Sequence, residues 1–238
     1  MIIGFSNGDF YRLFQNELER FSKKYINLYK ANNLANAIEL NCLNEGYIDY
    51  IILSNNLDLS YFKYISLHAP NLLYQKNDVS NRILSKLVEV YKKYSIKNIV
   101  IHVDMVKDWD IFSNYSMLPI SIENMDDRKD FGKSIADIKS ILEKYNFNLT
   151  LDLQHCFVND STMKLAFEFQ KLFNKRIVEY HISGFEKDLS HYPLFKSSQD
   201  EIIYSLQFKN LPIIIESTFD KIGEHKKELL YIKQKLNF

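Results

Sequence analysis

The sequence of 238 residues predicts one domain, a single (β/α)8 TIM barrel spanning residues 1–238. Short β-branched runs alternate with longer amphipathic runs along the chain, a pattern typical of a parallel sheet covered by helices. His, Glu and Asp residues end the strand-like runs, and from His68 to Glu216 they recur after 34, 21, 29, 29 and 35 positions. These steps fit βα units of roughly 30 residues. An open doubly wound sheet is the alternative, but it would divide the strand-end residues between two edges.

Eight apolar runs are expected to form the strands of the barrel, because each is short and rich in β-branched or aromatic residues. The third strand has two candidate positions. In chain order the expected strands are residues 1–5, 36–41, 49–53 or 62–67, 98–103, 118–123, 148–153, 177–182 and 211–216.

Five longer segments carry apolar residues at intervals of three and four positions, which predicts helices with one buried face. They are residues 10–33, 80–95, 132–146, 161–174 and 219–236. Asp160 and Ser161 are candidate caps for the fourth of these helices. Ser198 is a candidate cap for a short helix in DEIIYSLQF.

The composition, 46% hydrophobic and 25% charged, is ordinary for a globular protein that can bury a core. Thirty basic residues balance thirty acidic ones, which argues against nucleic acid or an anionic membrane as a partner. No run approaches the roughly 18 apolar residues of a membrane span, and the start does not have the pattern of a signal peptide. Cys42 and Cys156 cannot form a disulfide framework, so we expect reduced thiols and a cytoplasmic location. The composition leaves the oligomeric state open.

The strand ends carry the chemistry of the chain. Histidine and carboxylate are common ligands of zinc, manganese and iron. TIM barrels keep their active sites at the carboxyl ends of the strands. The residues at or just beyond those ends are His68, His102, Glu123, Asp152, His155, His181 and Glu216.

Glu123 and Glu216 each close an otherwise apolar strand, where a carboxylate is costly unless it is paired or bound to a metal. A salt bridge to Lys or Arg is the alternative for both. Asp152 and His155 form a D-x-x-H motif on a strand end and the loop beyond it. His181 lies between Asp152 and Glu216 in barrel order, which favours a ligand over a hydrogen-bonded core histidine.

The remaining candidates are expected around this group. His68 and His102 are equally consistent with metal ligands and with hydrogen-bonded polar residues that face the substrate, and His191 lies in a loop that reaches the site. Glu39 is expected to orient a ligand or a substrate hydroxyl. Trp109 could line the mouth of the pocket, with simple packing as the alternative. We expect His225, beside two lysines, to be a solvated surface residue.

From IGFS to IIIES the chain resembles the xylose-isomerase-like TIM-barrel superfamily, which includes sugar isomerases and epimerases and the endonuclease IV group. The resemblance to the isomerases and epimerases implies one divalent metal held by Glu123, Asp152, His181 and Glu216. It implies that His155 contacts the substrate and that Glu123 and Glu216 move a proton next to a carbonyl. These members usually carry an Arg shortly after the strand-seven His, and here ISGFEKDLSHYPL contains none.

The resemblance to endonuclease IV implies a larger site with up to three zinc ions and phosphodiester hydrolysis. His68 and His102 would join Glu123 around one ion, and His155 and His191 would hold another. The pattern has an Asp two residues before the last histidine. Here Leu189 stands at that position and Asp188 is one residue further away, so a third ion is doubtful.

The segment HISG…DLSH also suits a third relative, which uses clustered iron to oxidise peptide cysteines. Of the functions considered, a metal-dependent isomerase or epimerase acting on a small sugar-like substrate is favoured. The alternatives are the multinuclear zinc phosphodiesterase, the iron enzyme and a metal-binding barrel without catalysis. The expected cofactor is Zn, Mn or Fe, in one to three ions.

Overall fold

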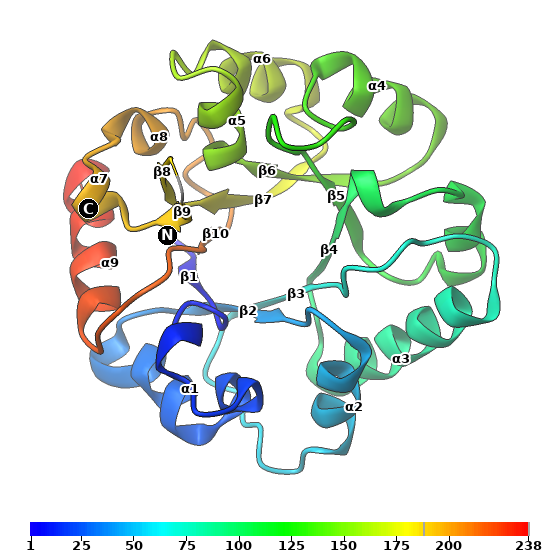
Figure 1. Ribbon diagram of the computed structural model, residues 1–238, viewed down its shortest axis with the longest axis horizontal. Coiled ribbons are helices and arrows are strands. Elements are labelled where there is room, and N and C mark those ends of the chain that lie inside the picture. Colours follow the sequence, from blue (N-terminus) through cyan, green and yellow to red (C-terminus); the bar gives the residue numbers. More distant parts are fainter. Residues whose placement is uncertain (188, 238) are drawn as a thin grey trace.

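The computed structural model describes residues 1–187 and 189–237. In this part of the chain eight parallel strands close into a barrel, which confirms the predicted fold (Figure 1). The order around the ring is β1, β10, β7, β6, β5, β4, β3 and β2. The strands are β1 (Ile3–Ser6), β2 (Ala37–Asn41), β3 (Tyr64–His68), β4 (Asn98–His102), β5 (Ile120–Glu123), β6 (Asn148–Asp152), β7 (Ile177–Ile182) and β10 (Ile213–Ile215).

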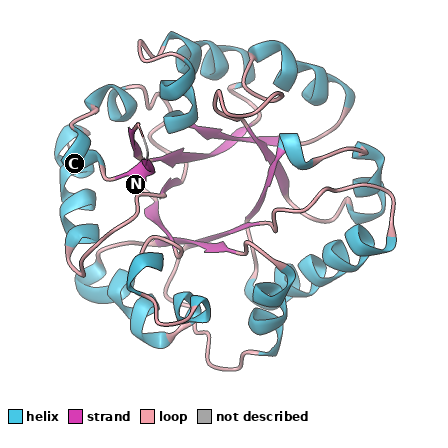
Figure 2. Ribbon diagram, viewed as in Figure 1, coloured by secondary structure: helices cyan, strands magenta, loops and turns pink. Residues whose placement is uncertain are grey.

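Helices surround the ring of strands on its outer side (Figure 2). A short antiparallel hairpin follows β7 and is made of β8 (Gly184–Glu186) and β9 (Leu189–Tyr192). No described helix is long and apolar enough to span a bilayer. The helices are α1 (Lys23–Lys30), α2 (Glu45–Leu53), α3 (Asp78–Tyr94), α4 (Ile135–Lys144), α5 (Leu153–Asn159), α6 (Lys164–Phe173), α7 (Leu194–Ser197), α8 (Asp200–Tyr204) and α9 (Glu224–Lys235).

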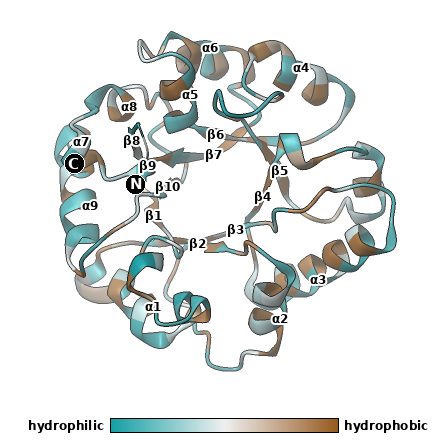
Figure 3. Cartoon of the chain, viewed as in Figure 1, coloured by the Kyte–Doolittle hydropathy of each residue, from teal (hydrophilic) through white to brown (hydrophobic). Residues whose placement is uncertain are grey.

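The apolar core lies between the strands and the helices. Successive residues of a strand point to opposite faces, and Ile38 and Leu40 of β2 join the apolar cluster that the helices cover. Glu39, between them, instead reaches His181 of β7, a strand that does not pair with β2. Along α3, α4 and α6, hydrophobic and hydrophilic stretches also alternate, as expected for helices with one buried face (Figure 3). The strands therefore send apolar side chains outwards and polar ones into the barrel.

The interior of the barrel is unusually polar below the strand ends. Asn98 of β4 donates from Nδ2 to Thr150 Oγ1 of β6 and to Glu179 Oε1 of β7, each at 3.0 Å. Ser121 Oγ lies 2.6 Å from Thr150 Oγ1. TIM barrels usually fill this space with branched apolar residues. Here hydrogen-bonded side chains fill it instead, and they support polar groups at the strand ends above.

Gly4 is required for the approach of β1 to β2. A Cβ at this position would lie 1.8 Å from the carbonyl oxygen of Ala37, far inside a van der Waals contact. The clash is with backbone atoms, which cannot move aside as a flexible side chain can. Any larger residue at Gly4 would therefore disrupt the pairing of these two strands.

Two of the predicted elements are placed differently by the structure. Residues 49–53 belong to α2, and the third strand is Tyr64–His68, close to the second candidate. The predicted helix 10–33 is broken into the 3-10 turns Tyr11–Leu13 and Glu17–Phe21, followed by α1. The side chains of Asn16 and Ser22 accept backbone N–H groups and start new elements there, which the apolar periodicity does not reveal.

Three further local predictions, two on helix caps and one on the exposure of His225, can be compared with the structure. Neither Asp160 nor Ser161 is the N-cap of α6, because that position is Met163, which makes no side-chain capping bond. The carboxylate of Asp160 does accept from the N–H groups of Thr162 and Leu165 at the start of the helix. Ser198 does not cap α8, because it adopts φ 55° at the end of α7. His225 was expected in solvent, but it is fully buried. It lies in the first turn of α9, against the rings of Phe5 and Phe10, so tertiary packing rather than its lysine neighbours sets its environment.

Candidate metal centre and active site

A cavity of about 190 Å³ opens at the carboxyl ends of the strands. Its wall contains most of the residues that the sequence singled out, and they come from β3, β4, β5, helix α5 after β6, the segment after β10, and the β8–β9 hairpin. The polar lining residues are Asn41, His68, Asn71, His102, Glu123, Asp126, Arg128, Lys129, His155, His191 and Glu216.

The four residues expected to hold a metal converge at the floor of this cavity. Glu123, Asp152, His181 and Glu216 each offer one ligand atom, and these atoms lie within 4.8 Å of one another. His181 Nδ1 is 2.8 Å from Glu123 Oε1 and 3.4 Å from Glu216 Oε2. Adjacent strands hold Asp152 and His181 in direct register. The group could therefore hold a divalent cation.

The local backbone aims one oxygen of Asp152 at this group. Asp152 is the N-cap of α5, and its Oδ1 accepts from the N–H of His155 at 2.9 Å. Asn124 fixes the strand end, since its Oδ1 accepts from the N–H of Asp152 at 2.8 Å and its Nδ2 donates to the Asp152 carbonyl at 2.9 Å. Asp152 Oδ2 has no hydrogen-bond partner among the described residues.

The charges at the floor fit a bound cation. Glu123 and Glu216 are paired only with histidines among the described residues, so the alternative of a Lys or Arg salt bridge does not hold. Burial raises the pKa of Asp152 to about 7. Burial also opposes the ionisation of Glu216, but His181 beside it prevails and lowers its pKa to about 2. Buried carboxylates that lack a permanent positive charge are costly, and a divalent ion compensates them.

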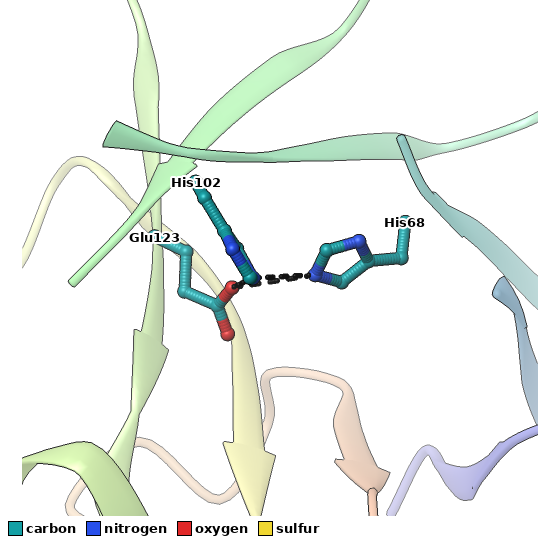
Figure 4. Close-up of side chains that lie close together, drawn as sticks. All are labelled: His68, His102 and Glu123. Carbon is teal, nitrogen blue, oxygen red and sulfur yellow. Dashed lines mark hydrogen bonds and ion pairs between the residues drawn. The ribbon is translucent and has the colours of Figure 1, made fainter. Parts of the chain in front are cut away.

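A second cluster shares Glu123 with the first. His68, His102 and Glu123 close on one another from β3, β4 and β5 (Figure 4). The two Nε2 atoms are 2.9 Å apart, and Glu123 Oε2 lies 3.5 Å from His68 Nε2 and 3.0 Å from His102 Nε2. Burial opposes the charged form of His68, but Glu123 outweighs it and raises the pKa of His68 to about 9. Burial lowers the pKa of His102, and His68 lowers it further.

His155 and His191 face each other across the cavity with ring centroids 6.4 Å apart. His155 Nδ1 lies 2.7 Å from the carbonyl oxygen of Asn124, so this nitrogen carries the proton and Nε2 is the free acceptor. His191 Nδ1 lies 3.7 Å from Glu216 Oε2. Asp188, which was considered as a partner of His191 for a third ion, lies outside the described residues.

The sequence missed Asp126, which lies in the same wall. Its Oδ2 is 3.9 Å from His155 Nε2, and the same carboxylate pairs closely with Arg128. Asp126 follows Glu123 by three residues in the loop after β5, where no periodicity applies. Only its position shortly after the strand-end carboxylate Glu123 could have indicated that Asp126 lies in the site.

The other nitrogen of His181 faces a pair of carboxylates inside the barrel. Nε2 lies 3.2 Å from Glu179 Oε1 and 3.2 Å from Glu39 Oε2. Both carboxylates are fully buried, and Glu39 does not line the cavity. Glu39 is thus placed to orient His181 and not to touch a substrate. Glu179 lies two residues before His181 on β7, and strand alternation places both on the same side.

Trp109 lies away from the site. Its ring packs against Tyr145 and Phe147 at centroid distances of 5.9 and 5.6 Å. It lines a separate cavity with Phe112 and residues that precede β5 and β6. The 3-10 turn Trp109–Tyr115 carries the ring from the end of β4 back over the outside of the barrel. The alternative of simple packing is therefore the correct one for Trp109.

The structure is similar to several solved barrels. It matches a probable 3-DHS dehydratase from Bacillus anthracis with a TM-score of 0.67 at 14% identity, covering 100% of this chain and 99% of that one. A xylose isomerase domain containing protein from Salmonella typhimurium gives 0.62 at 11% identity, covering 99% and 97%. D-psicose 3-epimerase from Clostridium cellulolyticum gives 0.60 at 11% identity, covering 100% and 98%.

No family model and no curated protein matches the sequence, so the likeness is one of structure. It spans the whole barrel and nearly the full length of each of these proteins. The chain therefore has the fold of the xylose-isomerase-like TIM barrels, the group that its strand-end residues resemble.

Proposed function

We propose that the protein is a divalent-metal-dependent isomerase or epimerase that acts on a small sugar-like substrate. The observation that carries this proposal is the convergence of Glu123 and Glu216 on one cation-binding group at the floor of one cavity. Two carboxylates next to a metal are what proton removal and return beside a carbonyl require. The cavity volume of about 190 Å³ suits a substrate of a few carbon atoms.

Two of the four proposed metal ligands would also carry the proton. Glu123, Asp152, His181 and Glu216 would hold the cation, which when bound would polarise the carbonyl of the substrate. The low pKa of Glu216 keeps it ionised at neutral pH, so it can accept a proton from carbon. Glu123 is also held ionised, because His181, His102 and His68 lower its pKa in spite of its burial, and it can exchange a proton on the other side.

Histidines around the floor would bind the hydroxyl groups of the substrate. His155 offers Nε2 as an acceptor, because its Nδ1 proton is held by the carbonyl of Asn124. His68 and His102 lie above Glu123, where they can contact a neighbouring hydroxyl. Their rings are held by each other and by the carbonyl of Ala69, so they need little ordering when a substrate binds.

The test is exchange of carbon-bound hydrogen with solvent. The protein is loaded with Mn²⁺ or Zn²⁺ and incubated in D₂O with a panel of ketoses, ketose phosphates and keto acids of sugars, and deuterium next to the carbonyl is followed by NMR. We expect incorporation by the wild type, none by Glu216→Gln, and unchanged incorporation by Glu143→Gln, an exposed glutamate of α4. Metal-loaded protein that exchanges no hydrogen on this panel would contradict the proposal.

One observation favours a second candidate, a multinuclear zinc phosphodiesterase. The cluster of His68, His102 and Glu123 could hold an ion beside the first one, with Glu123 shared. Two or more equivalents of zinc, together with hydrolysis of bis(p-nitrophenyl) phosphate, would favour this function. The balanced charge of the chain speaks against a long nucleic acid as its substrate.

A further inference from the structure

Arg20 is a buried cation that forms no salt bridge with a described carboxylate. It lies in the 3-10 turn Glu17–Phe21 and is only 2% exposed. Its Nε donates to the carbonyl of Glu17 at 3.0 Å, and its Nη1 donates to the carbonyl and Oδ1 of Asn41 at 3.4 and 3.2 Å. In the described part of the chain no carboxylate forms a salt bridge with Arg20, and no acceptor takes the Nη2 hydrogens. A buried charge of this kind calls for a counter-ion.

The guanidinium is also held rigidly in one orientation. Its Cζ lies 4.7 Å from the ring centroid of Tyr47 and 5.8 Å from that of Phe14. Glu17, which precedes it in the same turn, has its carboxylate engaged by the hydroxyl of Tyr47. Burial lowers the pKa of Arg20, but arginine stays protonated in proteins. The side chain is therefore a preorganised positive group.

Arg20 lines a cavity that adjoins the candidate active site. This second cavity has a volume of about 220 Å³ and shares Asn41, Leu43, His191 and Glu216 with the first. Gly8 lies in its wall, and a Cβ there would be 3.5 Å from Arg20 Nη1. The absence of a side chain at Gly8 leaves the approach to the guanidinium open.

The other arginine and lysine that line the two cavities are each paired with an aspartate. Arg128 pairs with Asp126, and Lys129 pairs with Asp104 at 2.7 Å. Two carboxyl groups line the second cavity, Glu216 and Asp9. Glu216 faces the histidines His181 and His191, and Asp9 Oδ1 accepts from Tyr29 at 2.5 Å. Burial raises the pKa of Asp9 well above its usual value, which favours its neutral form. Glu17 and Asp9 act on Arg20 through space, but neither forms a salt bridge with its guanidinium.

We propose that Arg20 is the centre of an anion subsite that binds the phosphate or carboxylate at one end of the substrate. This rests on the proposed function, and it narrows the substrate to an acidic or phosphorylated sugar. The anionic end would lie in the second cavity, while the reacting carbons lie beside Glu216 in the first. The planar fork of a guanidinium matches either anion with two parallel hydrogen bonds.

The test measures anion binding to metal-free protein, so that neither turnover nor the metal enters the result. Inorganic phosphate and acetate are titrated separately by calorimetry, and the anion that binds more tightly identifies which group the subsite takes. We expect saturable binding in the millimolar range. Arg20→Met keeps the apolar packing and removes the fork, so it should weaken binding about ten- to a hundredfold. Arg82→Met, an exposed arginine paired with Glu45, is the control and should bind as the wild type does.

Gly8→Val is a second variant that leaves Arg20 in place and fills the approach to it. It should weaken anion binding while its circular dichroism spectrum stays that of the wild type, so the test holds even if Arg20→Met does not fold. The proposal is overturned if neither anion binds to the wild type, or if a folded Arg20→Met or Gly8→Val binds as tightly as the wild type. Anion binding that depends on Arg20 in a protein without isomerase activity would support the subsite and contradict only the proposed function.

Discussion

His181 and Glu179, two residues apart on β7, are joined inside the barrel by a 3.2 Å contact between Nε2 and Oε1. Glu39 Oε2 approaches the same Nε2 from β2. Nε2 can donate to these carboxylates, so Nδ1, which faces Glu123 and Glu216, is the nitrogen that a cation would take. Histidines that bind metals are commonly oriented by such a carboxylate, which fixes the tautomer and makes the ligand nitrogen more basic.

Glu179→Gln should therefore weaken metal binding although Glu179 is not a ligand. An amide accepts a weaker hydrogen bond and carries no charge, so the His181 ring is held less firmly and its Nδ1 is less basic. We expect the dissociation constant for Zn²⁺ to rise about ten- to a hundredfold, as measured by competition with a chromogenic chelator.

The control for this prediction is Glu228→Gln. Glu228 is also fully buried, but its carboxylate accepts from the N–H groups of Leu194 and Phe195 and from Ser217. Its loss should lower the free energy of unfolding and leave zinc affinity unchanged. Equal zinc affinities of Glu179→Gln and the wild type would show that Glu179 does not orient His181.

Glu216→Gln should lower the metal content of purified protein. Glu216 follows β10 directly, and its Oε2 is 3.4 Å from His181 Nδ1. The amide keeps the shape of the side chain but removes a negative charge from the proposed ligand set. Metal per chain is measured by inductively coupled plasma mass spectrometry after purification without chelators. Unchanged metal content would remove Glu216 from the ligand set.

His102→Asn separates the two functions considered for the site. If the protein is an isomerase with one cation, the variant keeps its metal content and shows a higher KM, because His102 then contacts the substrate. Zinc titration and steady-state kinetics give both quantities. Loss of one equivalent of zinc would instead place an ion at the cluster of His68, His102 and Glu123 and favour the phosphodiesterase.

The fold and the centre of the site were predictable because their signals are local. Strand alternation decides which side of β7 His181 faces, and parallel pairing then brings it level with Asp152 of β6. A carboxylate or histidine at the end of a barrel strand, on the side that faces inwards, points towards the common opening. The four proposed ligands could therefore be named before the structure was known.

The errors concern residues whose environment is set by distant parts of the chain. Trp109 follows β4 closely, but a 3-10 turn takes it to an aromatic cluster with Tyr145 and Phe147. Asp126 lies in a loop and Arg20 in a short 3-10 turn, where spacing does not indicate direction. His225 has two lysine neighbours in sequence, yet the rings of Phe5 and Phe10 enclose it. None of these contacts leaves a periodic signal.

The burial of His225 predicts a loss of stability in mild acid. Burial, with a smaller contribution from Lys226, lowers its pKa from 6.5 to about 4. Between these values the unfolded chain binds a proton that the folded protein does not. The stabilisation is therefore complete above pH 6.5 and is lost as the pH falls towards 4. A shift of this size corresponds to about 3 kcal/mol.

The His225 contribution can be separated from that of the metal centre by comparison with His225→Gln, which has no charge at any of these pH values. Urea unfolding of both metal-free proteins gives the difference in their free energies of unfolding at each pH. As the pH falls from 7 to 4, the wild type should lose up to about 3 kcal/mol of unfolding free energy relative to His225→Gln. The carboxylates and histidines of the site titrate equally in both proteins and cancel. A difference that does not vary with pH would mean that His225 accepts a proton as readily in the folded protein as in the unfolded chain.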